Sequence, residues 1–201
     1  MRFSRGSFRQ VGVAVRAMLV LTLALGIGYT LLITGIGQLA LPAQANGSLI
    51  TVDGRTVGSS LIGQSFTTAK GTALPRWFQS RPSAAGTGYD GGASSGSNYG
   101  PNNAALIALI AGRQKAIETT DGVTKSRIPA DAVTASGSGL DPDISPAYAL
   151  LQVDRVAHAR GLCASVVKKL VESKIQGREL GYLGEPTINV LQLNLALANL
   201  G

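Results

Sequence analysis

The chain has 201 residues, of which 18 are basic and 11 acidic, and its formal net charge is +7. Four of the basic residues precede position 17 and no acid does, so the remainder carries 14 basic against 11 acidic residues, a balance of only +3. This weak balance, without a basic cluster interleaved with aromatic residues, argues against a nucleic-acid partner. One cysteine excludes an internal disulfide, and one histidine with one cysteine cannot supply a typical zinc site.

A long apolar segment follows the basic start of the chain. Residues 17–41 carry no charge, and the first charged residue after them is Asp53. About 20 apolar residues cross the ~30 Å hydrocarbon core of a bilayer, and short basic flanks stay in the cytoplasm. We therefore predict a basic cytoplasmic tail (1–16), a single transmembrane helix (17–41) and an extracytoplasmic domain (46–201) of a bacterial cell-membrane protein. A cleaved signal peptide is the alternative, since Ala43-Gln44-Ala45 fits a cleavage site, but the apolar run is longer than such signals usually have.

Small residues recur along this segment at helical spacing. Gly26, Gly28 and Thr30 are the central ones, and Thr22 and Thr34 extend the series. Small side chains let a second transmembrane helix approach closely, so these positions predict an interface with a partner helix. The simpler alternative is that glycine and threonine are common in membrane helices.

The remainder predicts a mixture of short strands and helices. Asp53-Gly54 lies between two β-branched runs and predicts a hairpin over 48–57. A Gly-, Ser- and Ala-rich insert without periodicity covers 69–100. The further expected elements are helices over 103–119, 146–160, 164–175 and 191–200, with a short connector or strand over 128–135 and a short strand over 187–190. The fold class is therefore α+β: a transmembrane helix, then one compact domain with a short hairpin and about four helices.

Residues capable of chemistry are few. Ser136-Gly137-Ser138-Gly139 offers backbone amides that could hold an anion, although a turn leading into the next helix is the simpler and preferred explanation. A hydrolase triad of Ser136 or Ser138 with His158 and Asp141 lacks a nucleophile-elbow motif. Cys163 lies between apolar neighbours and is expected to be buried. We identify no catalytic residue, and the chain reads as a partner-binding subunit rather than an enzyme.

Several blocks in order along the chain resemble one family, the C subunit of the bacterial Kdp potassium-transporting ATPase. These blocks are Gly58–Gln64, Arg81–Ala84, Ser95–Pro101, Val133–Pro142, Ile144–Ala147, Gln152, Arg155–Ala157, Ala159–Gly161, Gly184–Pro186, Asn189–Leu191 and Leu193–Leu197. The resemblance implies a single-span accessory subunit that neither conducts ions nor hydrolyses ATP. Its implied partners are a channel-like potassium-binding subunit, a P-type ATPase subunit and a small single-span subunit.

The resemblance also implies a role as a catalytic chaperone, which raises the affinity of the ATPase subunit for ATP. The family links the region of Gln152 and the preceding Ser136–Gly139 block to nucleotide. An extracytoplasmic domain does not meet cytoplasmic ATP, so we expect no intrinsic cofactor and an indirect effect through the partners. Direct contact with ATP is the alternative.

The motif matches give a set of expected contact residues. Beyond the membrane they are Arg81, Asn98, Ser136, Ser138, Asp141, Gln152 and Arg155. Asp141 could instead cap a turn, and Arg155 could pair with an acid of its own helix. A membrane-anchored binding module of the cell envelope, unrelated to potassium transport, fits the anchor but not the ordered motif series.

Overall fold

A computed structural model describes residues 5–200, and the side chains from Phe8 onward. Arg2 and the start of the predicted basic tail lie outside the described residues. The chain forms two compact units, residues 1–49 and 50–201, which are described separately.

The first unit is a continuous helical segment. It comprises α1 (Arg5–Leu21), a π-helical stretch (Thr22–Tyr29) and α2 (Thr30–Ala40), followed by the single turn α3 (Pro42–Ala45). The helix over Phe8–Ala40, 33 residues in all, is long and apolar enough to cross a membrane. The helix begins at Arg5, well before residue 17, so much of the predicted basic tail is itself part of the helix. The π-helix was not expected, because periodicity in an apolar run does not reveal a change from i→i+4 to i→i+5 hydrogen bonds.

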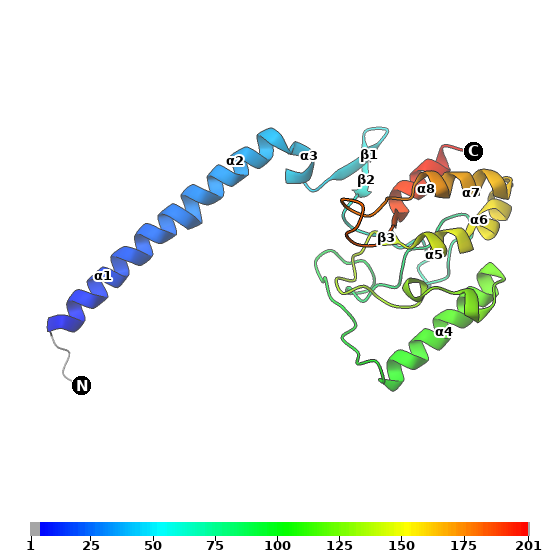
Figure 1. The fold of residues 1–201 in the computed structure, drawn as a ribbon, viewed down its shortest axis with the longest axis horizontal. Helices are drawn as coiled ribbons and strands as arrows, with labels where there is room; N and C mark the ends of the chain where they lie inside the picture. The colour runs from blue at the N-terminus through cyan, green and yellow to red at the C-terminus, as the bar shows by residue number, and fades with distance from the viewer. Residues whose placement is uncertain (1–4, 201) are drawn as a thin grey trace. The chain divides into compact units, whose positions relative to one another are not determined.

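Two small antiparallel sheets belong to the rest of the chain (Figure 1). The predicted hairpin is confirmed: β1 (Leu49–Val52) and β2 (Arg55–Ser59) are joined by Asp53 and Gly54, both at positive φ (49° and 76°). A two-residue turn with both φ positive matches the twist of the flanking strands. The second sheet pairs β3 (Asp143–Ile144) with β4 (Ile188–Asn189), which confirms the short strand expected near 187–190.

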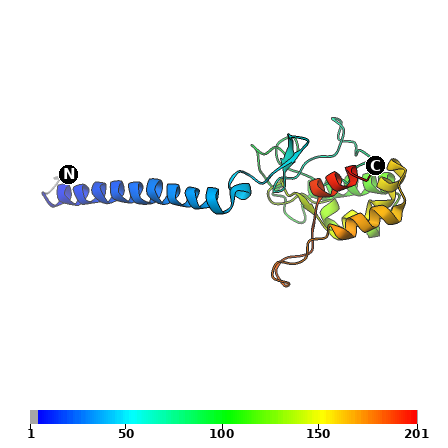
Figure 2. The same cartoon turned by 90° about the horizontal axis from the view of Figure 1, so that it is seen from above.

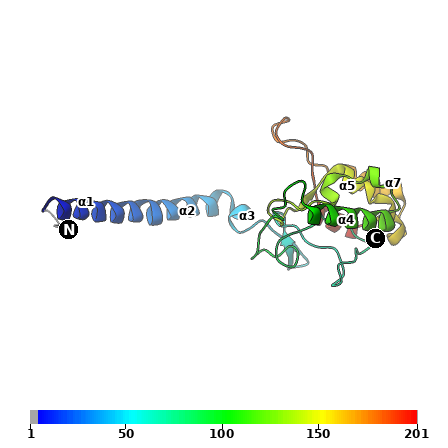
Figure 3. The same cartoon turned by 90° about the horizontal axis from the view of Figure 1, so that it is seen from below.

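Five α-helices follow between residues 50 and 200. They are α4 (Ala104–Asp121), α5 (Pro146–Leu151), α6 (Val153–Arg160), α7 (Ala164–Ser173) and α8 (Val190–Ala198), with 3₁₀ turns at Lys125–Arg127 and Ala130–Ala132. α7 packs against α5, α6 and α8, whereas α4 lies on the other side and contacts α6 (Figures 1 and 3). The buried core between them includes Phe78, Ile144, Val156, Val167, Val171, Ile188, Leu193 and Leu197. This arrangement confirms the α+β class.

Four helix ends show ordinary capping chemistry. The Asn103 side chain accepts from the amides of Ala105 and Leu106, and Gly122 ends α4 in the left-handed conformation. Ser145 caps α5 by accepting from the amide of Tyr148. Gly161 ends α6 at φ 68°. Each polar cap satisfies amides that the first turn leaves unpaired.

Other sequence expectations were wrong in detail. The helix expected over 146–160 is interrupted at Gln152, which separates α5 from α6. α7 ends at Ser173, two residues before the expected end at 175. Residues 130–132 form a 3₁₀ turn, so of the two alternatives for 128–135 the segment is a connector and not a strand. Cys163 is exposed, because it occupies the N-cap position of α7, where its side chain points away from the core.

The insert 69–100 has no helix or named strand, as predicted, but it contributes to the core. Phe78 and Ala85 within it are fully buried. Buried backbone without a sheet or helix needs other hydrogen-bond partners. The side chains that supply these partners belong to the candidate site.

Candidate functional site

Five consecutive backbone carbonyls, from Pro75 to Gln79, each accept a hydrogen bond from a side chain of α6, α8 or the α5–α6 junction. Arg155 donates to Pro75 (2.7 Å) and Trp77 (3.0 Å), and Arg160 donates to Arg76 (2.9 Å). Asn194 donates to Phe78 (3.0 Å) and Gln152 to Gln79 (3.2 Å). We call Gln152, Arg155, Arg160 and Asn194 the clamp. The clamp supplies what a neighbouring strand would otherwise provide.

The two amides of the clamp bind the backbone in both directions. Gln152 Oε1 accepts from the amide of Gln79 (2.6 Å), and Asn194 Oδ1 accepts from the amide of Phe78 (2.9 Å). Gln152 is 0% exposed and Asn194 is 2% exposed. Their amide groups therefore imitate the peptide groups of a paired strand, in a place where an unpaired group would be costly.

A buried ion pair reinforces the clamp. Arg155 Nε lies 2.7 Å from Asp121 Oδ1 at the end of α4, and the two side chains are only 6% and 5% exposed. Arg155 Nη2 also donates to Gln152 Oε1 (2.6 Å). Burial raises the pKa of Asp121, while the nearby Arg155 works in the opposite direction. Arg155 thus pairs with an acid of another helix, not of its own as one alternative had it, and ties α4 to α6.

The Ser136–Gly139 loop is held against the insert. Its carbonyls at Ser138 and Gly139 accept from Ser95 N–H (2.9 Å) and Ser83 O–H (2.6 Å). Gly139 has a φ of +67°, and a Cβ there would lie 2.5 Å from the Ser95 carbonyl, so this close approach requires glycine. The amides of Gly139 and Leu140 are already bonded to the hydroxyls of Ser136 and Ser138, which favours a turn over an anion nest.

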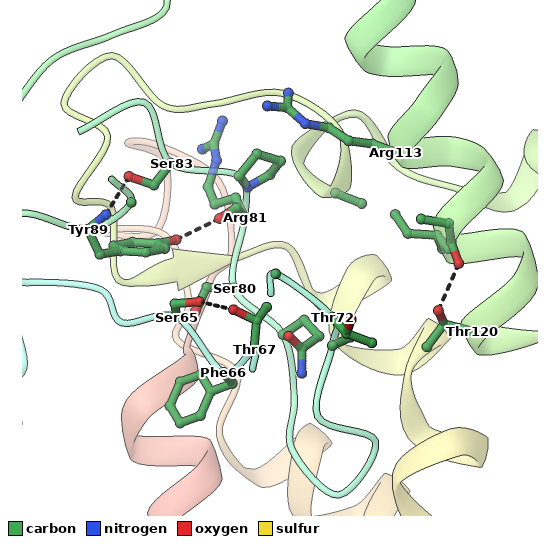
Figure 4. A pocket seen from close by; sticks show the side chains of 18 of the residues that line it. Ser65, Phe66, Thr67, Thr72, Ser80, Arg81, Ser83, Tyr89, Arg113 and Thr120 are labelled. Atoms are coloured by element: carbon green, nitrogen blue, oxygen red, sulfur yellow. Dashed lines mark hydrogen bonds between the residues drawn. The ribbon is translucent and has the colours of Figure 1, made fainter. Parts of the chain in front are cut away.

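A polar cavity of about 490 Å³ lies between residues 65–89 and α4 (Figure 4). Three cationic side chains, Lys70, Arg81 and Arg113, belong to its lining. Its hydroxyl-bearing lining residues are Ser65, Thr67, Thr72, Ser80, Ser83, Tyr89, Thr120 and Tyr148. Tyr89 O–H donates to the Arg81 carbonyl (2.7 Å), and burial raises the pKa of Tyr89 to about 12. This tyrosine is therefore a neutral donor at physiological pH.

Arg81 and Arg113 both contribute guanidinium groups to the lining of this cavity. Arg81 Nη1 pairs with Asp141 (2.8 Å), and Arg113 Nη1 donates to the Val133 carbonyl (2.8 Å). Arg81 Nε is buried without a hydrogen-bond partner. Burial lowers the pKa of Arg113, which marks a desolvated cation. The cavity lining thus has three basic side chains, one acid, Asp121, and many hydrogen-bond donors, but it holds no nucleophile paired with a base.

Arg81 also lines a separate, shallow depression, where several acidic side chains lie. These are Asp131, Asp141, Asp143 and Glu185. Asp141 Oδ1 accepts from the amide of Asp143 (3.0 Å), so it does cap a turn. Burial, and then the nearby Asp141, raise the pKa of Asp143. Among residues 5–200 no group of three or more His, Cys, Asp or Glu side chains has the geometry of a metal site.

The structure brings some of the predicted contact residues together. Arg81 and Asp141 form an ion pair, and Gln152 and Arg155 belong to the clamp. Asn98 is exposed, close in sequence to Ser95, which touches the Ser136–Gly139 loop. No described hydrogen bond links His158 to Ser136, Ser138 or Asp141, as a hydrolase triad would need.

Sequence reasoning missed the roles of Asn194 and Arg113. Asn194 lies at an inward position of an apolar helix, where a lone amide signals a buried backbone partner. Arg113 gave no such signal, because a basic residue near the middle of a helix normally faces solvent.

Packing within the chain does not require small residues at Gly26 or Gly28 in the apolar helix. A Cβ at Gly26 or Gly28 would meet its nearest neighbouring atom at 3.8 Å or 3.5 Å, ordinary contact distances. Thr30 O–H donates to the Leu25 carbonyl at 3.4 Å. The glycines are therefore not explained by packing within the chain.

Comparisons with known proteins agree over nearly the whole length. A family described as "KdpC: K+-transporting ATPase, c chain" matches residues 11–199. The chain is 59% identical over 191 residues to the "Potassium-transporting ATPase KdpC subunit" of Gemmatimonas aurantiaca, covering 92% of each chain. Proteins of the same description from Methylococcus capsulatus (52%; 92% of this chain, 94% of the relative) and Mycobacterium bovis (49%; 96% and 99%) are similar.

Proposed function

Because this chain belongs to the KdpC family, the c chains of the K+-transporting ATPase, we propose that it is a non-catalytic accessory subunit of an ATP-driven potassium uptake complex. One observation supports this proposal most directly. The first half of α4, residues 104–112, has no charged or polar side chain, yet most of it is exposed, including Ile107 (57%) and Leu109 (42%). A helix that is apolar on all sides is normally covered. A partner subunit is the natural cover for such a surface.

The proposed partners are a channel-like potassium-binding subunit, a P-type ATPase subunit and a small single-span subunit. α4 would dock on the channel-like subunit, and Gly26, Gly28 and Thr30 would pack against a partner transmembrane helix. Arg81, Asn98 and Asp141, together with Arg155, would define or support the outer contact surface.

We further propose that the chain raises the ATP affinity of the ATPase subunit indirectly, as a catalytic chaperone. The burial of Gln152 supports an indirect route, since both atoms of its amide are engaged by Gln79 and Arg155. Gln152 and the Ser136–Gly139 turn would then act by holding the outer domain in the shape that favours one pump conformation. An effector can shift a conformational equilibrium only through such differential contact.

The coupling can be measured on purified complexes prepared with and without this chain. We expect its omission to raise the apparent KM for ATP about fivefold or more, the range of ordinary allosteric coupling. The chain alone should hydrolyse no ATP above a buffer blank. An unchanged KM, or hydrolysis by the chain alone, would contradict the proposal.

The proposed outward orientation has a direct test in Cys163, the chain's one cysteine. Cys163 is exposed, and a hydrogen bond with Ser165 lowers its pKa, so it should react readily with maleimides. We expect a membrane-impermeant maleimide to label Cys163 in cells whose outer membrane has been opened but whose cytoplasmic membrane is intact. The Cys163→Ser variant should not be labelled. Ser138→Cys in that background gives a second exposed position. Labelling at both sites only after cell lysis would place the domain in the cytoplasm.

A further inference from the structure

The connection between α7 and β4 forms a hairpin-like loop, residues 176–187, that stands out from the surrounding helices (Figures 2 and 3, dark orange). Its base is closed by two hydrogen bonds between the backbones of Gln176 and Thr187 (2.8 and 3.1 Å). Its tip carries three exposed apolar side chains: Leu180 is 79% exposed, Tyr182 69% and Leu183 49%. This loop is therefore an ordered projection that presents apolar groups away from the core.

The backbone amides of the turn at the tip do not depend on water for their hydrogen bonds. Its turn amides are bonded internally: Gly181 N–H donates to the Arg178 carbonyl (3.0 Å), and the amides of Tyr182 and Leu183 donate to the Glu179 carbonyl (3.2 and 2.9 Å). Peptide groups that enter a hydrocarbon region must be satisfied in this way. Leu180 adopts a φ of +53°, an uncommon conformation for a branched side chain, in the turn enclosed by the Glu179–Leu183 bridge.

The loop carries one basic and two acidic side chains, Arg178, Glu179 and Glu185, and so a net charge of −1. Arg178 Nη2 lies 2.6 Å from Glu185 Oε2 near the base, so the loop's one basic side chain is already paired. The tip itself, Leu180 to Gly184, carries no charge. Leucine with tyrosine, an apolar body with a polar end, is the composition that favours the boundary between lipid headgroups and acyl chains.

The unit that carries this loop is tethered by a short segment to a helix that could cross a bilayer. The apolar helix Phe8–Ala40 precedes the second unit by only nine residues, Leu41–Leu49, which span at most ~30 Å when extended. A domain tethered so closely experiences a high effective concentration of lipid surface. From these observations we propose that the tip, Leu180–Leu183, inserts into the interfacial region of the membrane and gives the outer domain a second point of attachment.

The test uses the full-length chain in phosphatidylcholine vesicles, without partner subunits. In a Cys163→Ser background, Leu183→Cys carries an environment-sensitive nitrobenzoxadiazole label, and Ser126→Cys, on the exposed 3₁₀ turn, carries the matched control label. We expect the label at 183 to shift to shorter wavelength and to be quenched by lipids with a shallow nitroxide, several-fold more than the control. Adding Leu180→Ser and Tyr182→Ser should abolish this difference.

Two further arms separate the alternatives. Phosphatidylglycerol should leave the quenching unchanged, because the tip carries no free cation; dependence on anionic lipid would overturn the proposal. Equal quenching at 183 and 126 would overturn it too. So would protection of position 183 that appears only when the channel-like and ATPase subunits are added, since the tip would then dock on protein. The vesicle measurements contain no pump subunits, so a negative result there would leave the proposed accessory function standing.

Discussion

Replacing Gln152 with leucine is expected to lower the free energy of unfolding of the domain that follows the apolar helix by about 3 kcal/mol or more. The substitution preserves volume but leaves the N–H and C=O of Gln79 and one N–H of Arg155 without their partners. Each buried unpaired group costs about 1–3 kcal/mol. A loss of this size is a large part of the 5–15 kcal/mol typical of a whole domain.

Trp77 makes this measurement convenient. It is the chain's one tryptophan, it lies within the clamped segment, and the Arg160 guanidinium lies 4.5 Å from its ring centroid. Its fluorescence therefore reports on the clamp as well as on unfolding. Denaturant titration of the full chain in detergent, followed at Trp77 and by circular dichroism, gives the free energy.

Two variants sharpen the interpretation. Gln176→Leu makes the same chemical change at an exposed position and should alter stability by less than ~0.5 kcal/mol. Gln152→Glu keeps an acceptor for the Gln79 amide and for Arg155 but turns a second acceptor toward the Gln79 carbonyl. It should lose less stability than the leucine variant. Equal stability of wild type and Gln152→Leu would show that the clamp is not needed to hold residues 75–79.

The clamp also explains what sequence reasoning could and could not foresee. The hairpin, the caps at Asn103 and Ser145, and the stops at Gly122 and Gly161 depend on neighbouring residues, so local patterns identify them. The break at Gln152 depends on Gln79, 73 positions away, and no local pattern shows that distance. Cys163 illustrates the same limit, because apolar neighbours at a helix start do not decide which way the capping residue points.

For the candidate site too, the sequence identified individual residues but not their arrangement. The motif series indicated Arg81, Asp141, Gln152 and Arg155, but not that they lie in two separate networks. Arg81 and Asp141 face the polar cavity and the acidic depression, whereas Gln152 and Arg155 hold the segment that leads to Arg81. A shared motif series therefore combines residues that form a surface with residues that support it.

Introducing a charge on the exposed apolar half of α4 is expected to disrupt the complex without unfolding the chain. Ile107→Glu should lower the yield of complex purified through a tagged ATPase subunit about tenfold or more, because burying an unpaired carboxylate costs several kcal/mol and 1.4 kcal/mol is tenfold. The unfolding free energy should stay within ~0.5 kcal/mol of wild type, since the side chain is 57% exposed in the chain alone.

The control for this change lies on the same helix. Thr119→Glu alters the charge by the same amount at an exposed position in the polar half of α4, and it should leave the yield unchanged. Equal losses for both variants would point to a general effect of charge rather than to docking at residues 104–112. Unchanged yield and unchanged growth at limiting potassium for Ile107→Glu would exclude this surface as an interface.

The transmembrane helix and the apolar half of α4 should act as two linked attachments to the partner subunits, so that each strengthens the other. Two linked contacts bind more tightly than either alone, so the anchor partly compensates for a weakened outer contact. Gly26→Leu, which has room within its own chain, should by itself reduce the yield of complex moderately. Combined with Ile107→Glu it should lower the yield of complex well below that of either single variant, because both attachments are then weakened and neither raises the effective concentration of the other. A double variant that assembles as well as Ile107→Glu alone would show that the glycine face of the anchor makes no contribution to assembly.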